Sequence, residues 1–281
     1  MSFTITVQPA DRSFDVQPGE PILAAAIRQG VGLPYGCRDG ACGSCKSRLV
    51  SGRVTHGPHQ PRALSAAEED AGLILTCCAL PQTDCVVEAR SVPGAGEFPV
   101  IKFPARVLSR ERAAPDVIVL RLQLPANQNF RYRAGQYVEV LLRDGARRSY
   151  SMANAMHTIG SPPAIELHLR HMPGGRFTDH VFGAMPDKEI LRLEGPFGSF
   201  FLREDSPKPI VLLAAGTGFA PIKAILERLQ QQAVDRPARL YWGGRRPRDL
   251  YRHDWCTALA AGLPQLRYVP VVSDALPEDG W

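Results

Sequence analysis

Residues 36–46 read GCRDGACGSCK, and this glycine-rich stretch brings Cys37, Cys42 and Cys45 close together in the chain. A fourth cysteine, Cys77, completes the pattern C-x4-C-x2-C-x31-C. Thiolates are soft ligands that suit iron and zinc. Glycines let backbone N–H groups approach a bound group without a Cβ in the way. The stretch therefore predicts a loop that wraps a metal centre.

The spacing of the four cysteines bears on which metal centre this is. A structural zinc site with four thiolates usually has two short C-x2-4-C pairs, whereas Cys42 and Cys45 form a single one here. Three close cysteines followed by a distant fourth are typical of a [2Fe–2S] cluster, which carries one electron at a time. We expect the cluster, with zinc and a disulfide framework as the less favoured alternatives.

The remaining cysteines are given ordinary roles. Cys78 could replace Cys77 as the fourth ligand, but the apolar run before Cys77 favours Cys77. Cys85 and Cys256 are interpreted as buried small residues. A chain of 281 residues with seven cysteines and no signal peptide indicates a cytoplasmic protein.

The first 90 residues resemble a plant-type ferredoxin domain throughout. A hairpin is expected from FTITVQP and RSFDVQP, a helix from EPILAAAIRQG, and a returning strand from VVEAR. The segment SAAEEDAG carries a capping box from Ser65 to Glu68, which predicts a short helix before Cys77. The cluster loop would lie between the two helices.

Composition and a proline- and glycine-rich stretch suggest several domains. The net charge of +5 comes without a basic stripe, which argues against nucleic-acid binding, and no apolar run is long enough for a membrane span. The stretch SVPGAGEFPVIKFP is rich in proline and glycine and predicts a linker. We expect a ferredoxin domain at 1–92, a linker at 93–102, and two further domains at 103–204 and 205–281.

Residues 103–204 predict a six-stranded antiparallel barrel, because short strands follow one another without a long helix. The candidate strands are Phe103 to Leu108, Asp116 to Leu124, Gln136 to Leu142, Arg147 to Ala153, Ile165 to His171 and Glu189 to Glu194. His168 and His171 would lie on opposite faces of one strand, and the seven histidines show no metal-ligand or triad spacing.

Two segments of this barrel carry polar chemistry. In RRSYSMAN, Arg148 and Tyr150 share one strand face and Ser151 takes the other. A guanidinium can bind a phosphate and a phenol ring can stack on a flat heterocycle. In MPGGRFTDHV, Gly174 and Gly175 precede a helix start that could face a pyrophosphate. Together these segments resemble the FAD-binding domain of the ferredoxin–NAD(P) reductase superfamily.

Residues 205–281 predict half of a doubly wound nucleotide-binding fold. KPIVLLAAG reads as a parallel strand covered on both faces. Gly216 and Gly218 then turn the chain into a helix expected to open at Pro221, which can place a pyrophosphate at a helix N-terminus. RLYWGGRRPRDLY and QLRYVPVVSDA supply two more strands, with a helix from Asp249 to Ala261 between them.

The order of the three domains resembles reductase components of aromatic-ring oxygenases and diiron hydroxylases, and in particular the CDP-6-deoxy-delta-3,4-glucoseen reductases. The likeness implies a monomer that oxidises NAD(P)H and passes electrons to an oxygenase or deoxysugar dehydrase component. It also implies residue roles. The cluster ligands would be Cys37, Cys42, Cys45 and Cys77; the flavin residues Arg148, Tyr150, Ser151, Gly174, Gly175, Phe177 and Thr178; the dinucleotide residues Gly216, Thr217, Gly218 and Arg245; and the catalytic residues Tyr150, Ser151 and Thr217.

The number of electrons that each cofactor carries determines the expected mechanism. NAD(P)H gives two electrons as hydride, FAD can release them singly, and the cluster takes one. The family continues beyond Trp281 with further βα units, so the chain is expected to be a fragment or shortened form. One alternative is an electron-relay protein without dinucleotide activity. Another is a flavin-binding interaction module that contains a structural zinc site. Three arginines, Arg245, Arg246 and Arg248, favour NADPH locally, whereas the family likeness favours NADH, which we follow.

Overall fold

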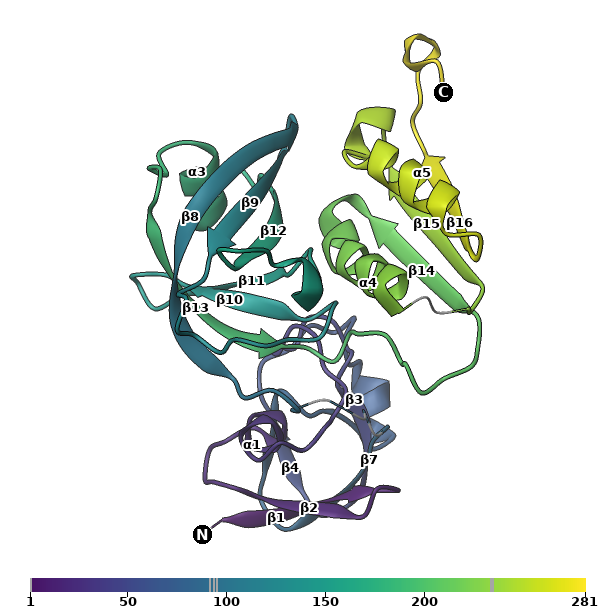
Figure 1. The fold of residues 1–281 in the computed structure, drawn as a ribbon. Coiled ribbons are helices and arrows are strands. Elements are labelled where there is room, and N and C mark those ends of the chain that lie inside the picture. The colour runs from purple at the N-terminus through teal and green to yellow at the C-terminus, as the bar shows by residue number, and fades with distance from the viewer. Residues whose placement is uncertain (1, 91, 93, 95, 233–234) are drawn as a thin grey trace. The chain divides into compact units, whose positions relative to one another are not determined.

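The computed structural model describes residues 2–90, 92, 94, 96–232 and 235–281 (Figure 1). It forms two compact units. The first contains residues 1–99 together with 197–200, and the second contains residues 100–196 together with 201–281. Positions 93 and 95 of the expected linker 93–102 lie outside the described residues, as does position 91.

The first unit contains a five-stranded sheet in the order β2-β1-β7-β3-β5. The predicted hairpin is confirmed, because β1 and β2 pair antiparallel from Phe3↔Val16 to Val7↔Arg12. The strands are β1 (Phe3–Gln8), β2 (Arg12–Val16), β3 (Lys46–Ser51), β5 (Leu73–Leu75) and β7 (Cys85–Glu88), and a separate pair is formed by β4 (Val54–His56) and β6 (Ala79–Pro81). Helix α1 (Ile22–Arg28) begins after Pro21 and buries Ile22 and Leu23.

The short helix before the fourth cysteine is also confirmed as α2 (Ala66–Asp70). Its capping box is complete: the Ser65 hydroxyl accepts the Glu68 N–H, and the Glu68 carboxylate accepts the Ser65 N–H at 2.9 Å. Lys46, at the start of β3, donates to the same carboxylate at 2.5 Å. These bonds join the end of the cysteine loop to the segment that leads to Cys77.

The predicted six-stranded antiparallel barrel lies in the second unit, with the sheet order β11-β10-β13-β8-β9-β12. An antiparallel bridge between Met152 and Leu167 joins the chain just after β11 to β12 and closes the sheet. Side chains such as Leu120, Leu122 and Val138 fill the interior. The elements are β8 (Ile101–Ala114), β9 (Val117–Gln123), β10 (Tyr137–Leu141), β11 (Arg147–Ser151), β12 (Ala164–Arg170), α3 (Arg176–Phe182) and β13 (Ile190–Phe197).

The same unit contains a parallel sheet in the order β14-β15-β16. Helices α4 and α5 pack on one face of this sheet around Leu212, Leu240 and Trp242 (Figure 1). The elements are β14 (Ile210–Ala215), α4 (Phe219–Gln232), β15 (Ala238–Gly244), α5 (His253–Gly262) and β16 (Leu266–Val272).

Both helix starts differ from the sequence prediction. Helix α4 begins at Phe219 rather than Pro221, directly after a 3-10 turn formed by Gly216–Gly218. Helix α5 begins at His253 rather than Asp249. The Asp249 carboxylate instead folds back and accepts the N–H groups of Arg245 and Arg246, both at 3.0 Å, which ends a separate 3-10 turn.

The prediction that β14 is covered on both faces is wrong for this structure. Ile210 and Leu212 are buried, but Val211 is 62% exposed and Leu213 is 72% exposed. Helices α4 and α5 cover the same face, so the continuous apolar run presents alternate residues to solvent. We call the face with Val211 and Leu213 the bare face of the sheet.

Candidate functional site

The structure brings the four predicted cluster ligands together in the first unit as two pairs of thiols. The Sγ atoms of Cys45 and Cys77 lie 3.3 Å apart, although β3 and α2 separate them in the chain. The Cys37 thiol interacts with that of Cys42, and the Cys37 N–H donates to Cys42 Sγ at 3.4 Å. Two thiols for each iron are what a two-iron cluster needs.

Backbone N–H donors surround the Cys37–Cys42 pair of thiols. Ala41 N–H donates to Cys37 Sγ, and Ser44 N–H donates to Cys42 Sγ, both at 3.4 Å. Burial raises the pKa of the Cys42 thiol, but the N–H donors of Cys37 and Ser44 and the Ser44 hydroxyl together lower it below its usual value. Such donors favour the thiolate, the form that ligates iron, and hydrogen bonds to sulfur tune a cluster's potential.

The same geometry disfavours a structural zinc. Within the described part of the chain, no point gathers three His, Cys, Asp or Glu side chains around a single metal ion. A mononuclear zinc site would need its four sulfurs around one centre at about 2.3 Å. The arrangement of the thiols as two pairs instead matches the two irons of a [2Fe–2S] cluster.

One loop glycine is required by space and by conformation. Gly40 has φ +76°, and a Cβ there would lie 2.8 Å from the His59 side chain and 2.9 Å from Cys78 Sγ. Cys78 itself lies beside the pairs, with its Sγ 3.5 Å from that of Cys77. The structure thus leaves Cys77 as the partner of Cys45 and Cys78 as a neighbour.

A segment distant in sequence packs beside the first ligand in this unit. The Ser199 hydroxyl accepts the Tyr35 N–H at 2.9 Å and donates to the Tyr35 carbonyl at 3.0 Å. The Arg38 guanidinium lies 3.8 Å from the centroid of the Phe197 ring. Residues 197–200 therefore hold the chain on both sides of Cys37. Nothing in the cysteine spacing could have indicated this contact.

The predicted flavin residues converge on one part of the barrel. On β11, Arg148 pairs with Val140 and Tyr150 with Val138, which places both on one face as predicted. Burial raises the pKa of Tyr150 to about 12, so the phenol is neutral. Its ring centroid lies 5.5 Å from that of Phe177 on α3. The two segments singled out from the sequence are therefore neighbours, as a flavin site needs.

The Gly174-Gly175 turn is fixed by its own contacts. The Thr178 hydroxyl donates to the Met172 carbonyl at 2.9 Å, so it holds the turn rather than facing solvent. A Cβ on Gly175 would lie 2.6 Å from that hydroxyl oxygen and 2.7 Å from the Met172 carbonyl. The Gly175 N–H also donates to the Met172 carbonyl, at 2.8 Å, so the turn is closed by its own hydrogen bonds.

A cavity of about 400 Å³ lies at the carboxyl ends of β14, β15 and β16, where ligands bind open α/β sheets. The predicted residues Gly216 and Arg245 line it, and Thr217 and Gly218 belong to the adjoining 3-10 turn. The complete lining is Arg170, Ala215, Gly216, Gly243, Gly244, Arg245, Asp249, Val271 and Ser273.

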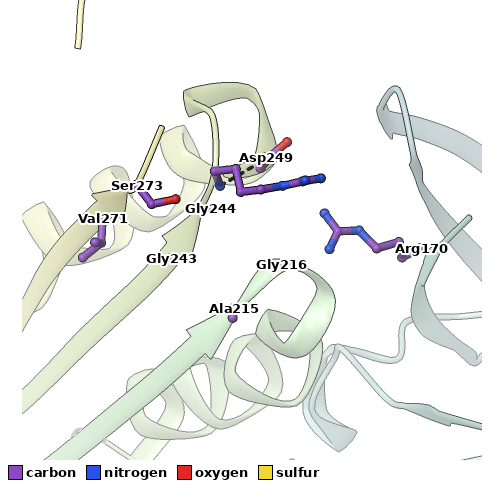
Figure 2. Close-up of a pocket in the computed structure, with 9 residues that line it drawn as sticks. Arg170, Ala215, Gly216, Gly243, Gly244, Asp249, Val271 and Ser273 are labelled. Atoms are coloured by element: carbon purple, nitrogen blue, oxygen red, sulfur yellow. Dashed lines mark hydrogen bonds between the residues drawn. The ribbon is translucent and has the colours of Figure 1, made fainter. Parts of the chain in front are cut away.

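Sequence reasoning missed seven of these nine lining residues, and three of the seven have polar side chains: Arg170, Asp249 and Ser273. Arg170 comes from barrel strand β12, where its Nε donates to Asp116 at 2.8 Å, and Figure 2 shows its guanidinium directed toward Gly216. A Cβ on Gly216 would lie 3.1 Å from Arg170 Nη1. The barrel thus contributes a cation to the nucleotide cavity, which no local motif indicates.

Three family models match successive parts of the chain. They describe a 2Fe-2S iron-sulfur cluster binding domain at residues 5–82, an oxidoreductase FAD-binding domain at 104–202 and an oxidoreductase NAD-binding domain at 212–281. Terephthalate 1,2-dioxygenase reductase component 1 of Comamonas sp is 37% identical over 98% of this chain and 80% of that protein. The chain belongs to the 2Fe-2S ferredoxin reductase family.

Other members of the family agree with this assignment. The CDP-6-deoxy-L-threo-D-glycero-4-hexulose-3-dehydrase reductase of Yersinia pseudotuberculosis is 37% identical over 97% of this chain and 80% of its own length. Among solved structures, the Amycolatopsis cytochrome P450 reductase GcoB is 36% identical, with a TM-score of 0.77 over 98% of this chain and 83% of that chain.

Membership of this ferredoxin reductase family establishes the activity. The protein is an NAD(P)H-dependent oxidoreductase in which electrons pass from NAD(P)H through FAD to a [2Fe–2S] cluster and on to an acceptor partner. The predicted fold class, cofactors and function are confirmed. No described helix is long and apolar enough to cross a membrane.

Proposed function

We propose that this chain is the NADH-dependent reductase of a system whose acceptor is a separate oxygenase or dehydrase component. The observation that carries the proposal is the presence, in one chain, of paired thiols suited to one-electron transfer and a nucleotide cavity beside a flavin-type barrel. Several relatives are named as reductases of dioxygenase and dehydrase systems. We further propose a cytoplasmic monomer with domains at 1–92, 103–204 and 205–281, and the seven free cysteines support a reducing compartment.

Each site residue has a proposed task. Arg148 binds a flavin phosphate, Tyr150 stacks on the flavin ring, and the Ser151 hydroxyl donates to a ring nitrogen. The backbone of the Gly174-Gly175 turn meets the pyrophosphate, and Gly216, Thr217, Gly218 and Arg245 hold the dinucleotide. FAD supplies the conversion of a two-electron hydride into single electrons. The protein's own contribution is binding, orientation and exclusion of water.

The preference for NADH draws support from how one of the arginines near the cavity is used. Arg246 donates to both carboxylate oxygens of Asp279, each at 3.0 Å, and lies 3.8 Å from Glu278. Asp249 adds a carboxylate to the cavity lining. An arginine already paired with carboxylates is a weak ligand for a 2′-phosphate, because the phosphate must compete with them.

The coenzyme preference is tested by the rate at which each coenzyme bleaches the flavin absorbance at saturating concentration. We expect NADH to act faster than NADPH. Asp279→Asn should release Arg246 and raise the rate with NADPH relative to NADH. A clear NADPH preference in the unaltered chain would reject this part of the proposal, and no bleaching by either coenzyme would favour the electron-relay alternative.

The acceptor is tested separately by mixing the reduced chain with purified oxygenase or dehydrase components. Reoxidation of the cluster at a rate that saturates with component concentration identifies an acceptor. A chain that reduces an artificial acceptor such as ferricyanide but neither class of component would refute the proposed acceptor class without affecting the coenzyme result.

A further inference from the structure

A set of titratable side chains lies between helix α4 and the barrel, away from the nucleotide cavity lining. Lys223 and Glu227 of α4 are 7% and 8% exposed, and His168 of β12 is 4% exposed. Their partner Glu166 is also on β12. Charged side chains are seldom buried without a specific arrangement of partners. We call Lys223, Glu227, Glu166 and His168 the buried charge cluster.

Lys223 lies at the centre of this cluster. Its Nζ donates to Glu227 Oε1 at 2.6 Å and lies 3.3 Å from Glu166 Oε1. It also donates to the Ala153 carbonyl at 3.2 Å. One ammonium group therefore joins α4 to β12 and to the chain that continues β11.

Glu227 makes a second connection to that same chain segment. Its Oε2 accepts the Ala155 N–H at 2.8 Å and the Thr158 hydroxyl at 2.6 Å. Residues 153–155 follow Ser151 by two to four positions, and Met152 between them closes the barrel. The pair thus fixes α4 against the segment that carries the proposed flavin residues.

His168 extends the cluster toward the nucleotide cavity. Its Nε2–H donates to Glu166 at 2.9 Å, and its Nδ1 accepts the Tyr251 hydroxyl at 2.8 Å, the tautomer that satisfies both partners. Burial lowers the pKa of His168, which keeps the ring neutral. Tyr251 lies two residues after Asp249, which lines the cavity.

The carboxylates of the cluster stay charged only because their partners are held in this arrangement. Burial acts to raise the pKa of Glu166, but the hydrogen bond from His168 and the charge of Lys223 outweigh it and lower the pKa to about 2. Two carboxylates thus share one ammonium. A buried ion pair adds little net stability compared with apolar side chains, but its loss on one side leaves an uncompensated charge. Its value is the fixed position that it demands.

We propose that the Lys223–Glu227 pair is a positioning device that sets the approach of the dinucleotide to the flavin. Helix α4 starts directly after Gly216–Gly218, and the pair ties its second and third turns to the chain that follows Ser151. The inference rests on the proposed placement of the flavin at Tyr150 and Ser151 and of the dinucleotide at Gly216. Hydride transfer depends steeply on this distance, since a misplacement of about 1 Å can lower a rate by about a hundredfold.

The test compares three variants of the full chain loaded with FAD and cluster. Lys223→Met leaves the two carboxylates without their cation. Lys223→Met combined with Glu227→Gln removes both charges and keeps side chains of similar length. Arg228→Met is the matched control, because Arg228 lies on the same helix but its ion pair, with Glu204 outside the helix, is more exposed to solvent.

Two steps are measured for each variant. The first is the rate of flavin reduction at saturating NADH, together with the Kd for NADH and the charge-transfer absorbance of the complex. The second is the rate of cluster reduction after photoreduction of the flavin, which needs no dinucleotide. Melting temperature is recorded as the measure of fold stability.

We expect Lys223→Met to slow flavin reduction at least tenfold and to weaken the charge-transfer band, with cluster reduction unchanged. The double variant lacks the pair that fixes α4, so it should keep the fold but also reduce its flavin slowly, and Arg228→Met should match the unaltered chain. Parallel losses in both steps, or an unchanged first step, would overturn the inference. If Lys223→Met fails to fold, the double variant decides: slow flavin reduction with normal cluster reduction supports the inference, and a full rate with a normal charge-transfer band contradicts it. An unaltered chain that NADH does not reduce would instead reject the proposed function.

Discussion

At the scale of single residues, cysteine and glycine positions determine the cluster loop. The cysteine spacing predicts the four ligands, and the structure places their thiols in two pairs. The spacing could not show that Ser199 binds Tyr35 beside Cys37, since the two lie far apart in the chain. Nor could it show that Gly40 leaves room for His59 and Cys78.

Replacing one ligand should remove the cluster and spare the flavin. Cys42→Ser takes away a thiolate that backbone N–H groups already favour, so the reduced-state paramagnetic signal should disappear while FAD stays bound. Cys78→Ser is the matched control and should keep the signal, because Cys77 is the partner of Cys45. A signal that survives in Cys42→Ser, or is lost in Cys78→Ser, would show that the ligand assignment is wrong.

The flavin site offers a second test at this scale. Arg148→Ala should lower FAD affinity about ten- to a hundredfold, because a charged phosphate contact contributes about 1.5–3 kcal/mol. Flavin released on dilution and followed by fluorescence gives the affinity. Arg143→Ala, in the turn between β10 and β11, serves as the control for loss of a nearby positive charge. Equal FAD retention in the two variants would count against the role of Arg148.

At the scale of elements, local signals predicted existence better than boundaries. The capping box gave α2 correctly, since its two hydrogen bonds are formed within four residues. The six barrel strands appear because alternation is also local. The start of α5 was wrong because Asp249 binds backbone N–H groups upstream instead of opening the helix. Helix boundaries of this kind depend on which partner a side chain finds in the fold.

The capping carboxylate gives α2 a defined pH dependence. Hydrogen bonds from Lys46 and from the Ser65 N–H lower the pKa of Glu68 to about 2, from an ordinary value of 4.5. Because the folded pKa is depressed, the stabilising effect is present above about pH 4.5 and is lost as the pH falls toward 2. Thermal melts of the unaltered chain and Glu68→Gln should differ at pH 6 and converge near pH 2.

Lys46→Met provides the check on the cause of that shift. It removes the largest contribution to the lowered pKa, so its difference from the unaltered chain should shrink over the same pH window. A Glu68→Gln difference that stays constant from pH 6 to pH 2 would mean that the carboxylate charge plays no part.

At the scale of the whole molecule, sequence reasoning gave the order of domains but not the contacts among distant segments. The buried charge cluster contains an i,i+4 pair within α4, but no local pattern marks the contacts of that helix with β12, or of β12 with Tyr251 before α5. The bare face of β14 was missed for a related reason. A continuous apolar run indicates that a strand can be covered on both faces, but among the described residues one face of β14 stays exposed at Val211 and Leu213.

The bare face should limit how concentrated the protein can be made. An apolar patch on an edge strand promotes association between copies. Leu213→Lys should raise the concentration at which light scattering increases and leave flavin reduction by NADH unchanged. Ile190→Lys, which alters an exposed apolar residue of a barrel strand, is the control and should have a smaller effect. Equal effects of the two variants would contradict a special role for this face.

The burial of the Lys223–Glu227 pair also determines how the protein responds to ionic strength. Salt screens exposed charges over about 10 Å at 0.1 M, but a pair closed off from solvent is screened much less. Flavin reduction at saturating NADH should therefore stay constant from low to high salt, whereas encounter with a separate acceptor depends on exposed charges. The change of turnover rate with salt would then measure the association of the reductase with its acceptor, and the salt-independent rate of flavin reduction would be the internal control.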